Sequence, residues 1–277
     1  CSYVVGSATN CTLPTLSDGT WDISSTVTDP AGNSSTSPST LSVSIDTDAV
    51  GGRIPDLDAA SDTGVSSTDD ITSDTTPTFS LTGQVVGDVV VITASRAGAT
   101  DVTCTYTVGV ASSCTLGALT DGEWSVVATI TDLSGNTGST TALPLTIATS
   151  ASTPGVPDLL DASDTGSSST DNLTSDATPS ISAGSLPAGS SVTVTASKAD
   201  GTVVSCTYVV SPSVSSCDLP TLSDGAWSIA SVVTDPAGNV SPASAALSFT
   251  LNKSLLDSAL DAESSSSSGT LPQDIDR

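Results

Sequence analysis

The chain repeats itself at a spacing of 103 residues, and this periodicity limits the folds that it can adopt. Trp21, Trp124 and Trp227 lie 103 residues apart, and an Asp-Gly pair precedes each of them. The segment Thr-Asp-x-x-Gly-Asn begins seven residues after each tryptophan, with Leu or Pro and Ser or Ala between its fixed positions. Another shared segment starts with Pro-Asp-Leu at positions 55 and 157. This self-similarity predicts tandem domains of one type.

The repeats divide the chain into four parts. We expect the C-terminal part of a truncated repeat at 1–46, full repeats at 47–149 and 150–251, and an acidic, serine-rich tail or linker at 252–277. Residues 1–46 have no counterpart of 47–103, so their sandwich would expose its core and its strand edges. Either this part is cut from a longer polypeptide or another chain completes it. Completion by another chain would link copies head to tail into an open filament.

Each repeat has the residue pattern of β-strands. Apolar and polar residues alternate along 90–94, 124–130 and 192–196, which is the period of a half-buried strand. Thr, Val and Ser dominate these segments, and Gly, Asp, Asn and Pro interrupt the chain about every 8–12 residues. About 100 residues per repeat is typical of an immunoglobulin-like sandwich. The expected fold class is all-β, with antiparallel, tandem immunoglobulin-like β-sandwich repeats in an elongated rod.

The composition excludes several functions. The 277 residues include 30 acidic and 5 basic ones, for a net charge of −25, and no histidine. Phosphate repulsion therefore excludes nucleic acid as a partner. Without histidine the most common general base is missing, and serine without histidine or a nearby lysine is not a nucleophile, so we expect no enzyme. The sequence has no run of about 18 apolar residues, so we expect no membrane insertion of this segment.

Six cysteines form one pair in each repeat. The partners are separated by nine residues in the first two pairs and by ten in the third, and each pair brackets a predicted hairpin. A zinc site is the poorer alternative, because two thiols per repeat without histidine do not complete the metal's ligand shell. Disulfides indicate an oxidising environment, hence an extracellular (secreted) or cell-surface protein. The expected pairs are Cys1–Cys11, Cys104–Cys114 and Cys206–Cys217.

Three motifs together resemble the bacterial Ig-like repeats of large surface adhesins and biofilm-associated proteins. They are the Asp-Gly-x-Trp turn, the Thr-Asp-x-x-Gly-Asn segment, and Pro-Asp-Leu followed by Ser-Asp-Thr-Gly and Thr-Asp, and they cover roughly residues 1–251. The resemblance implies an extracellular rod, often stiffened by calcium at domain junctions, that displays a distant adhesive tip or builds a matrix. It implies neighbouring repeats or copies of the chain itself as partners.

The acidic residues cluster in the segment shared by the two full repeats. Oxygen ligands without His or Cys suit a hard cation, calcium above all. The alternative is a solvated acidic surface that keeps a secreted protein soluble. The candidate ligands in these loops are Asp56, Asp58, Asp62 and Asp69 in the first, and Asp158, Asp161, Asp164 and Asp171 in the second.

The resemblance also implies calcium ligands at the domain junctions. In related adhesins these ligands are the aspartate after a repeat's last strand and the aspartate of Thr-Asp-x-x-Gly-Asn. The alternative role for the latter is to cap its own turn, and the two roles can coexist. The candidates are, in chain order, Asp46 with Asp29, then Asp132 alone because Ala148 replaces its partner, then Asp235 beside Asn252.

The function that we expect is structural, namely a rod segment whose role is reach and stiffness. The alternative is a ligand-binding module in which loops at the ends of the sandwich recognise a surface glycan or a host protein. An exposed tryptophan could stack on sugar, but the alternating apolar face that contains each tryptophan favours packing in the core. A third possibility is an accessory domain of a secreted enzyme.

Overall fold

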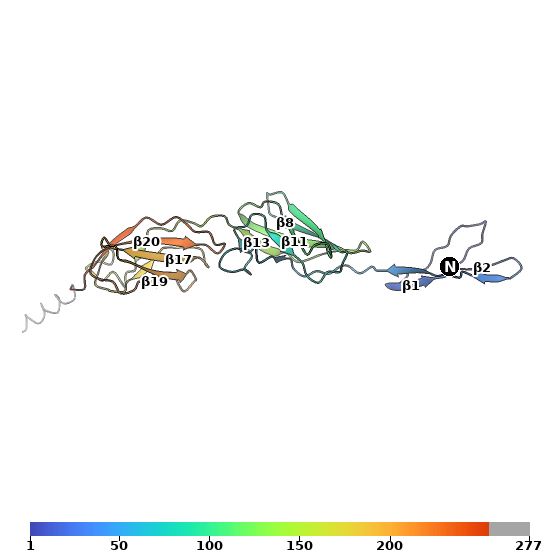
Figure 1. The fold of residues 1–277 in the computed structure, drawn as a ribbon, viewed down its shortest axis with the longest axis horizontal. Helices are drawn as coiled ribbons and strands as arrows, with labels where there is room; N and C mark the ends of the chain where they lie inside the picture. Colours follow the sequence, from blue (N-terminus) through green and yellow to red (C-terminus); the bar gives the residue numbers. More distant parts are fainter. Residues whose placement is uncertain (255–277) are drawn as a thin grey trace, which may run out of the picture. The chain divides into compact units, whose positions relative to one another are not determined.

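The structure is a computed structural model that describes residues 1–254, with strands β1–β21 as its regular elements (Figure 1). Contacts divide the chain into two units, each considered by itself: Cys1–Ser61 with Thr76–Leu145, and Asp62–Thr75 with Thr146–Arg277. The predicted tail lies outside the described residues from residue 255 onward. In the described part, no helix has the length and apolar character needed to cross a membrane.

The first repeat, residues 1–46, consists of two separate antiparallel strand pairs. β1 (Gly19–Ile23) pairs with β4 (Leu41–Ile45), and β2 (Thr26–Thr28) pairs with β3 (Ser34–Thr36). The strands that would cover the apolar face of β1 correspond to residues 47–103 of the next repeat and have no counterpart here. Trp21 is therefore 39% exposed, whereas Trp124 and Trp227 are 5% and 2% exposed. The predicted core position is thus confirmed for the two full repeats.

The second repeat is a sandwich of two sheets. Along β11 the side chains at 124, 126, 128 and 130 are buried, which confirms the alternation predicted from the sequence. The smaller sheet runs in the order β10 (Ser113–Thr115), β7 (Thr78–Ser80), β5 (Asp56–Leu57). The larger sheet runs in the order β6 (Ile71–Thr72), β13 (Leu143–Ile147), β11 (Gly122–Thr131), β8 (Val89–Ser95), β9 (Val102–Thr107), with β12 (Thr137–Ser139) paired to β11.

The third repeat has the same two sheets. Its core forms where the inner faces of both sheets meet, with Ile181, Val194, Trp227 and Phe249 at most 2% exposed. The smaller sheet runs in the order β14 (Asp158–Leu159), β16 (Ser180–Ser182), β19 (Ser216–Asp218). The larger sheet runs in the order β15 (Leu173–Thr174), β21 (Leu247–Leu251), β20 (Gly225–Thr234), β17 (Ser191–Ser197), β18 (Val203–Val209).

One strand pair in each full repeat differs from the predicted antiparallel arrangement. β6 pairs with β13 in parallel, and β15 pairs with β21 in parallel. The cause is a change of sheet, because β5 belongs to the smaller sheet and the chain then crosses to the edge of the larger one. Strands of two residues carry no periodic signal from which their direction can be predicted.

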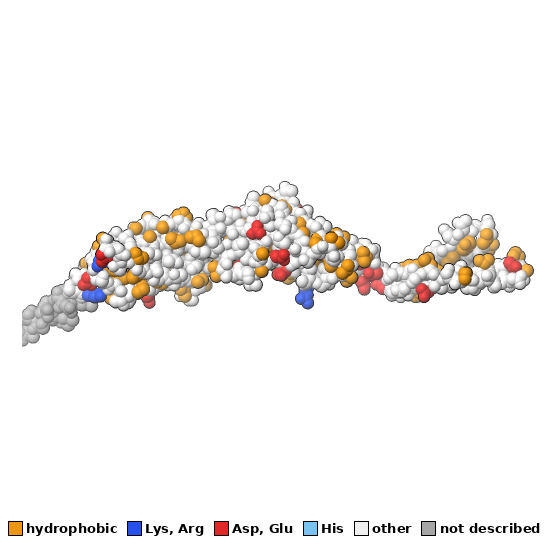
Figure 2. All heavy atoms as spheres, in the orientation of Figure 1, with side chains coloured by type: hydrophobic (Ala, Val, Ile, Leu, Met, Phe, Trp, Pro, Cys, Tyr) orange, Lys and Arg blue, Asp and Glu red, His pale blue; other side chains and the backbone are white. Residues whose placement is uncertain are grey.

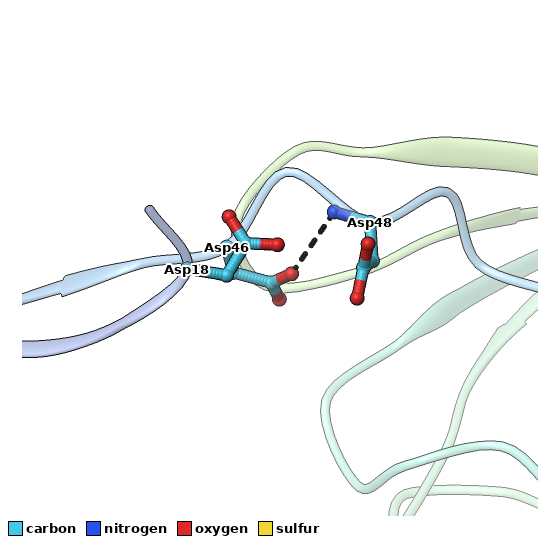
Figure 3. A group of neighbouring side chains, drawn as sticks. All are labelled: Asp18, Asp46 and Asp48. Atoms are coloured by element: carbon cyan, nitrogen blue, oxygen red, sulfur yellow. Dashed lines mark hydrogen bonds between the residues drawn. The ribbon is translucent and has the colours of Figure 1, made fainter. Parts of the chain in front are cut away.

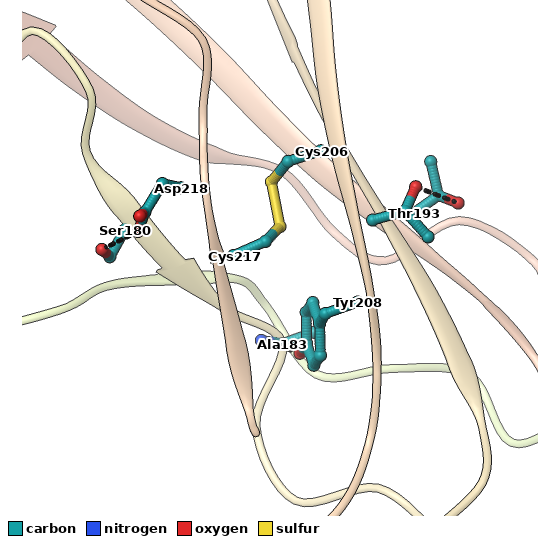
Figure 4. The surroundings of a disulfide bond; sticks show 8 residues. Ser180, Ala183, Thr193, Cys206, Tyr208, Cys217 and Asp218 are labelled. Atoms are coloured by element: carbon teal, nitrogen blue, oxygen red, sulfur yellow. Dashed lines mark hydrogen bonds between the residues drawn. A yellow bond between two sulfur atoms is a disulfide. The ribbon is translucent and has the colours of Figure 1, made fainter. Parts of the chain in front are cut away.

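The three predicted disulfides are present, with Cα–Cα distances of 5.8, 5.8 and 6.0 Å. In the full repeats each one joins the two sheets, since β18 and β19 belong to different sheets, as do β9 and β10 (Figure 4). The expected hairpin is therefore a connection that turns from one sheet to the other. Tyr208 lies beside its disulfide, and its hydroxyl accepts a hydrogen bond from the backbone N–H of Ala183 at 3.2 Å. The disulfides of the two full repeats thus tie each sandwich together at one edge.

Candidate metal site

The aspartate of each Thr-Asp-x-x-Gly-Asn segment caps its own turn. In the first repeat the Asp29 carboxylate accepts hydrogen bonds from the backbone N–H and the side-chain amide of Asn33, at 2.8 and 2.9 Å. Asp132 is bonded in the same way by Asn136, and Asp235 by Asn239. The turn-capping role is therefore present in all three repeats.

These hydrogen bonds stabilise the charged form of the carboxylate. The side-chain amide of Asn33 is the main cause that holds the pKa of Asp29 below its usual value, and the Asn136 amide does the same for the pKa of Asp132. Backbone N–H groups within each turn lower the pKa further. Both aspartates therefore stay ionised at neutral pH.

The loops that follow β5 and β14 are each closed by a buried aspartate. Asp62 and Asp164 are both 4% exposed, and each accepts a hydrogen bond from a backbone N–H eight residues later, that of Asp70 at 3.4 Å and of Asn172 at 3.1 Å. Asp70 and Asn172 adopt a φ of 58°, a conformation that Asn and Asp tolerate better than most residues. These two buried carboxylates hold their loops in shape.

The other acidic residues predicted in these loops form no group of three close carboxylates in the described part of the chain. Asp69 and Asp171 are exposed and cap short turns by accepting the N–H of Ile71 and Leu173. Asp56 and Asp158 are exposed on β5 and β14, Asp58 is half-buried just after β5, and Asp161 is exposed in a turn. Within residues 1–254, three carboxylates approach one another closely enough to share a metal ion only at Asp18, Asp46 and Asp48.

The group formed by Asp18, Asp46 and Asp48 lies where β1 and β4 meet (Figure 3). The antiparallel register pairs Gly19 with Ile45, which places Asp18 beside the residues that leave β4. One oxygen of each carboxylate lies within 4.8 Å of the others. Asp18 accepts hydrogen bonds from the N–H and the hydroxyl of Thr47 at 3.1 and 2.8 Å, and Asp46 accepts one from the N–H of Asp48 at 3.3 Å.

This donor set fits calcium. Calcium takes six to eight oxygen ligands at about 2.3–2.6 Å, so two of its ligands can lie up to about 5 Å apart. All three carboxylates are exposed, which leaves water free to complete the ligand shell. An ion held here by Asp18, Asp46 and Asp48 would neutralise carboxylates that otherwise repel one another. On the face shown in Figure 2, acidic side chains occur in small separate clusters and basic ones are few.

The sequence predicts that Asp46 and Asp29 lie together at the first junction. In the structure they do not. Asp29 follows β2, at the far end of the 19–28 segment from Asp18 and Asp46, and ten residues of extended chain span about 30 Å. Asp46 instead meets the turn of the next repeat. Its carboxylate accepts a hydrogen bond from the Ser134 hydroxyl at 3.3 Å, and its backbone carbonyl accepts one from the Asn136 side chain at 3.1 Å.

The acidic group weakens at the later junctions. Ala148 occupies the position of Asp46 after β13, and its carbonyl accepts a hydrogen bond from the Asn239 side chain at 2.7 Å. Ser150 occupies the position of Asp48. After β21 the equivalent residues are Asn252 and Ser254, and Asp224 accepts the N–H of Lys253 at 3.3 Å. The hydrogen bond from the turn asparagine to the carbonyl after the preceding repeat's last strand recurs. The set of three carboxylates is specific to the first junction among the described residues.

Sequence reasoning missed two members of this group. It assigned Asp18 to the Asp-Gly turn alone and did not single out Asp48. The antiparallel pairing of β1 with β4 is the signal that could have identified Asp18 and Asp48. The Asp-Gly turn lies at the start of β1, and Asp46 follows the end of β4. An antiparallel pair brings the start of one strand to the end of its partner.

Comparisons with known proteins give one family and a set of distant structures. The model of the bacterial Ig-like domain family matches residues 51–149 and 150–253. A crystal structure of a tetra-tandem repeat in the extending region of a large adhesion protein is 22% identical, with 86% of this chain and 58% of that chain covered and a TM-score of 0.32. This chain therefore spans less than two thirds of that structure. No curated protein matches the chain significantly.

Two further solved structures have similar scores. A Ca²⁺-stabilized adhesin with which an Antarctic bacterium binds ice is 19% identical, with 84% of this chain and 56% of that chain covered and a TM-score of 0.34. A structure from a 1.5-MDa bacterial ice-binding adhesin is 21% identical, with 85% and 74% covered and a TM-score of 0.36.

Proposed function

The chain belongs to the bacterial Ig-like domain family, and we propose that it is a non-catalytic rod segment of an extracellular bacterial adhesin or biofilm matrix protein. In this role tandem repeats supply reach and stiffness, and the binding of a surface is left to another part of the assembly. In rods of tandem repeats each repeat contacts only its neighbours along the chain, so the length of such a rod scales with the number of repeats.

One contact that recurs between successive repeats carries the proposal. The asparagine that ends a repeat's Thr-Asp-x-x-Gly-Asn turn donates a hydrogen bond to the carbonyl just after the last strand of the preceding repeat. Asn136 bonds Asp46 in this way, and Asn239 bonds Ala148. The same side chain is anchored to its own turn by Asp132 or Asp235. A fixed turn that holds the exit of the previous repeat limits bending there.

The chemistry of the chain supports an extracellular place and a structural role. Three disulfides form and persist in oxidising compartments. The absence of histidine from the sequence removes the residue most often used for proton transfer near neutral pH. A net charge of −25 keeps an exposed rod soluble and disfavours nucleic acid as a partner.

Calcium stiffening at the first junction is part of the same proposal. Asp18, Asp46 and Asp48 supply the oxygen ligands, and Asp46 also contacts the 132–136 turn of the next repeat. An ion on Asp46 would therefore fix a residue that two repeats share. Extracellular modules bind calcium with dissociation constants of about 10⁻⁴–10⁻³ M, which matches millimolar calcium outside cells.

Residues 1–46 present an apolar strand face, and we propose that strands of the same repeat type cover it. Val27 and Leu41 are 63% and 64% exposed, in addition to Trp21. The covering strands come either from a longer polypeptide or from another chain, and the second case gives a filament. Sedimentation of the chain over a range of concentrations distinguishes them, because only assembly between chains increases with concentration.

Residual dipolar couplings measured on the full chain in solution test the rod. If the recurring contact fixes the junctions, the second and third repeats will share one alignment tensor at physiological ionic strength. Separate tensors for the two repeats would show independent tumbling and would exclude a stiff rod. The first junction is tested separately by comparing the alignment of residues 1–46 with that of the second repeat before and after calcium is chelated, since the second junction lacks the carboxylate group.

A further inference from the structure

A pocket of about 670 Å³ lies at one end of the second repeat. Its walls come from three segments of the first unit: the residue that follows β5, the loop between β7 and β8, and the connection between β9 and β10. Apolar walls are contributed by Leu81, Val108 and Val110, and polar groups by Asp58 and Gln84. A pocket with apolar walls and a few polar groups is the usual form of a small-ligand site.

The walls are held in place before any ligand arrives. The N–H of Gly87 donates to the carbonyl of Val108 at 3.0 Å, and the N–H of Val108 donates to the carbonyl of Asp88 at 2.9 Å, so the two loops are bonded together. The buried Asp88 carboxylate also accepts the N–H of Val85 at 2.9 Å. Val86 packs so closely on Gly109 that a Cβ atom there would lie 2.7 Å from a Val86 methyl carbon. A preformed site loses little entropy on binding.

The polar groups of the pocket include two side chains with acceptor oxygens, Gln84 and Asp58. The side-chain oxygen of Gln84 is buried and has no hydrogen-bond partner, while its amide nitrogen donates to the Thr82 carbonyl at 3.4 Å. A buried acceptor without a donor is costly, and a ligand hydroxyl would remove that cost when the Gln84 side chain turns its oxygen into the pocket on binding. The Asp58 carboxylate and the Ser112 hydroxyl also line the pocket. No lysine or arginine is among the lining residues, all of which belong to the described part of the chain.

The third repeat has leucine at two polar positions of this pocket. Leu160 follows β14 where Asp58 follows β5, and Leu186 stands where the second repeat has Gln84. Leu186 packs against the hydrophobic core of its repeat. The tyrosine and the disulfide of this region are shared by both repeats, so the framework is the same and the ligand-facing groups are not.

We propose that the pocket binds one neutral sugar ring of a glycan. A sugar presents several hydroxyl donors to the Asp58 carboxylate and to the unpaired Gln84 oxygen. Its C–H face can pack on Leu81, Val108 and Val110. The Asp58 carboxylate, with no Lys or Arg in the lining, disfavours phosphate, sulfate and carboxylate ligands. This ligand goes beyond the rod function and does not depend on it, because a stiff rod needs no pocket and a pocket needs no stiff junction.

The test is a titration of the isotope-labelled full chain with a panel of neutral methyl glycosides, followed by amide chemical shifts. We expect saturable shifts in the millimolar range at residues 83–87 and 108–113, and none at the equivalent 185–189 and 210–215. Gln84→Leu, which copies the third repeat, should abolish the shifts while circular dichroism and the melting temperature show a folded protein. Leu186→Gln serves as the matched substitution in the other repeat.

Three results would overturn the proposal. The first is an absence of shifts for every glycoside at the highest soluble concentration. The second is equal shifts in both repeats, and the third is binding that survives in a folded Gln84→Leu variant. Calcium chloride and methylammonium chloride are titrated as well, and saturable shifts at 83–87 with either cation but with no glycoside would assign the pocket to a cation instead. None of these results bears on the alignment tensors that test the rod.

Discussion

The side-chain amide of Asn136 donates a hydrogen bond to the backbone carbonyl of Asp46, which precedes it by 90 residues, at 3.1 Å. The same amide group bonds the Asp132 carboxylate at 2.9 Å. Asn239 makes the equivalent pair of bonds to Ala148 and Asp235. One side chain therefore shapes its own turn and holds the preceding repeat, so turn stability and junction order are coupled.

Replacing Asn239 with Ala should loosen the junction that it forms. The variant loses the bond to the Ala148 carbonyl, which contributes about 1 kcal/mol, together with the side-chain bond to the Asp235 carboxylate, for which about 1.5–3 kcal/mol is typical. We expect the second and third repeats to give separate alignment tensors in the variant. Asn33→Ala is the matched control, because Asn33 bonds Asp29 in the same way within the first repeat. If the second and third repeats of Asn239→Ala still shared one alignment tensor, the hydrogen bond from Asn239 to Ala148 would not be what orders their junction.

Calcium should stabilise the first junction through Asp46. We expect chelation to lower the melting temperature and to increase bending in solution scattering, and Asp46→Ala to remove most of this response. Asp56→Ala is the control, since Asp56 is exposed on β5 outside the carboxylate group. The second junction, with Ala148 in place of Asp46, should not respond. Identical melting curves and scattering profiles with calcium and with chelator would remove calcium from the mechanism.

Gly64 is placed so that almost no other residue fits. Its φ is +114°, and a Cβ atom there would lie 2.0 Å from the Pro236 carbonyl oxygen. Next to it, the Val65 N–H donates to that oxygen at 3.4 Å, and the Thr63 hydroxyl donates to the Ala237 carbonyl at 3.0 Å. Gly64→Ala should therefore release the 62–75 loop from this turn and speed hydrogen exchange at the Val65 amide.

The control for this substitution is Gly98→Ala. Gly98 also has a positive φ, +80°, but a Cβ atom there would meet nothing within 4 Å. Backbone strain costs about 1–3 kcal/mol in such positions, so only a loss at Gly64 that clearly exceeds the loss at Gly98 reports the contact with Pro236. Equal losses would mean that the loop is not held by this contact.

Opening the disulfide of the third repeat should destabilise it without unfolding the second. The loop between Cys206 and Cys217 spans 11 residues, so the chain-entropy contribution is about 2–3 kcal/mol. The paired substitution to Ser should lower the unfolding free energy of the third repeat by that amount, seen as a lower denaturant midpoint with an unchanged slope. Tryptophan fluorescence follows each repeat when Trp124 or Trp227 is replaced by Phe in turn. A loss shared equally by both repeats would contradict independent stapling.

Acid should weaken the second repeat through Asp132. Its folded pKa lies below the unfolded value of 3.8, so its stabilising effect is complete above that pH and is lost as the pH falls through the folded pKa. Thermal melts between neutral pH and about pH 2 should therefore show a steeper loss in the native protein than in Asp132→Ala. Asn136→Ala retains the carboxylate but loses the main donor that lowers its pKa, so its melting temperature should also depend less on pH. Parallel curves for all three proteins would rule out this linkage.

The strand content and the core follow from the sequence because they depend on local alternation. The period of two around Trp124 and Trp227 is enough to predict which side chains are buried, and the paired cysteines are enough to predict the disulfides. The junctions depend instead on which ends of the strands lie together. Asp46 and Asp29 belong to the same repeat but to its opposite ends, and no periodicity in the sequence expresses that separation.

Side-chain groups that are brought together by strand register could not be predicted from the sequence either. Asp18 joins Asp46 only because Gly19 pairs with Ile45, and the alternation of apolar residues does not define that pairing. The pocket beside Gln84 depends on two loops whose residues show no regular pattern. What the sequence does contain is the contrast between Gln84 and Leu186, which becomes informative once both are placed on the same fold.

The disulfides that tie the two sheets together also determine how much length a repeat can release under tension. A pulled repeat of 103 residues would extend to roughly 350 Å if every residue were free. The bond between Cys104 and Cys114, with a sequence separation of 10, withholds only about 30 Å of that length. An oxidised repeat therefore releases nearly its full contour length when it unfolds under force, and reduction would lengthen each unfolding step by about a tenth.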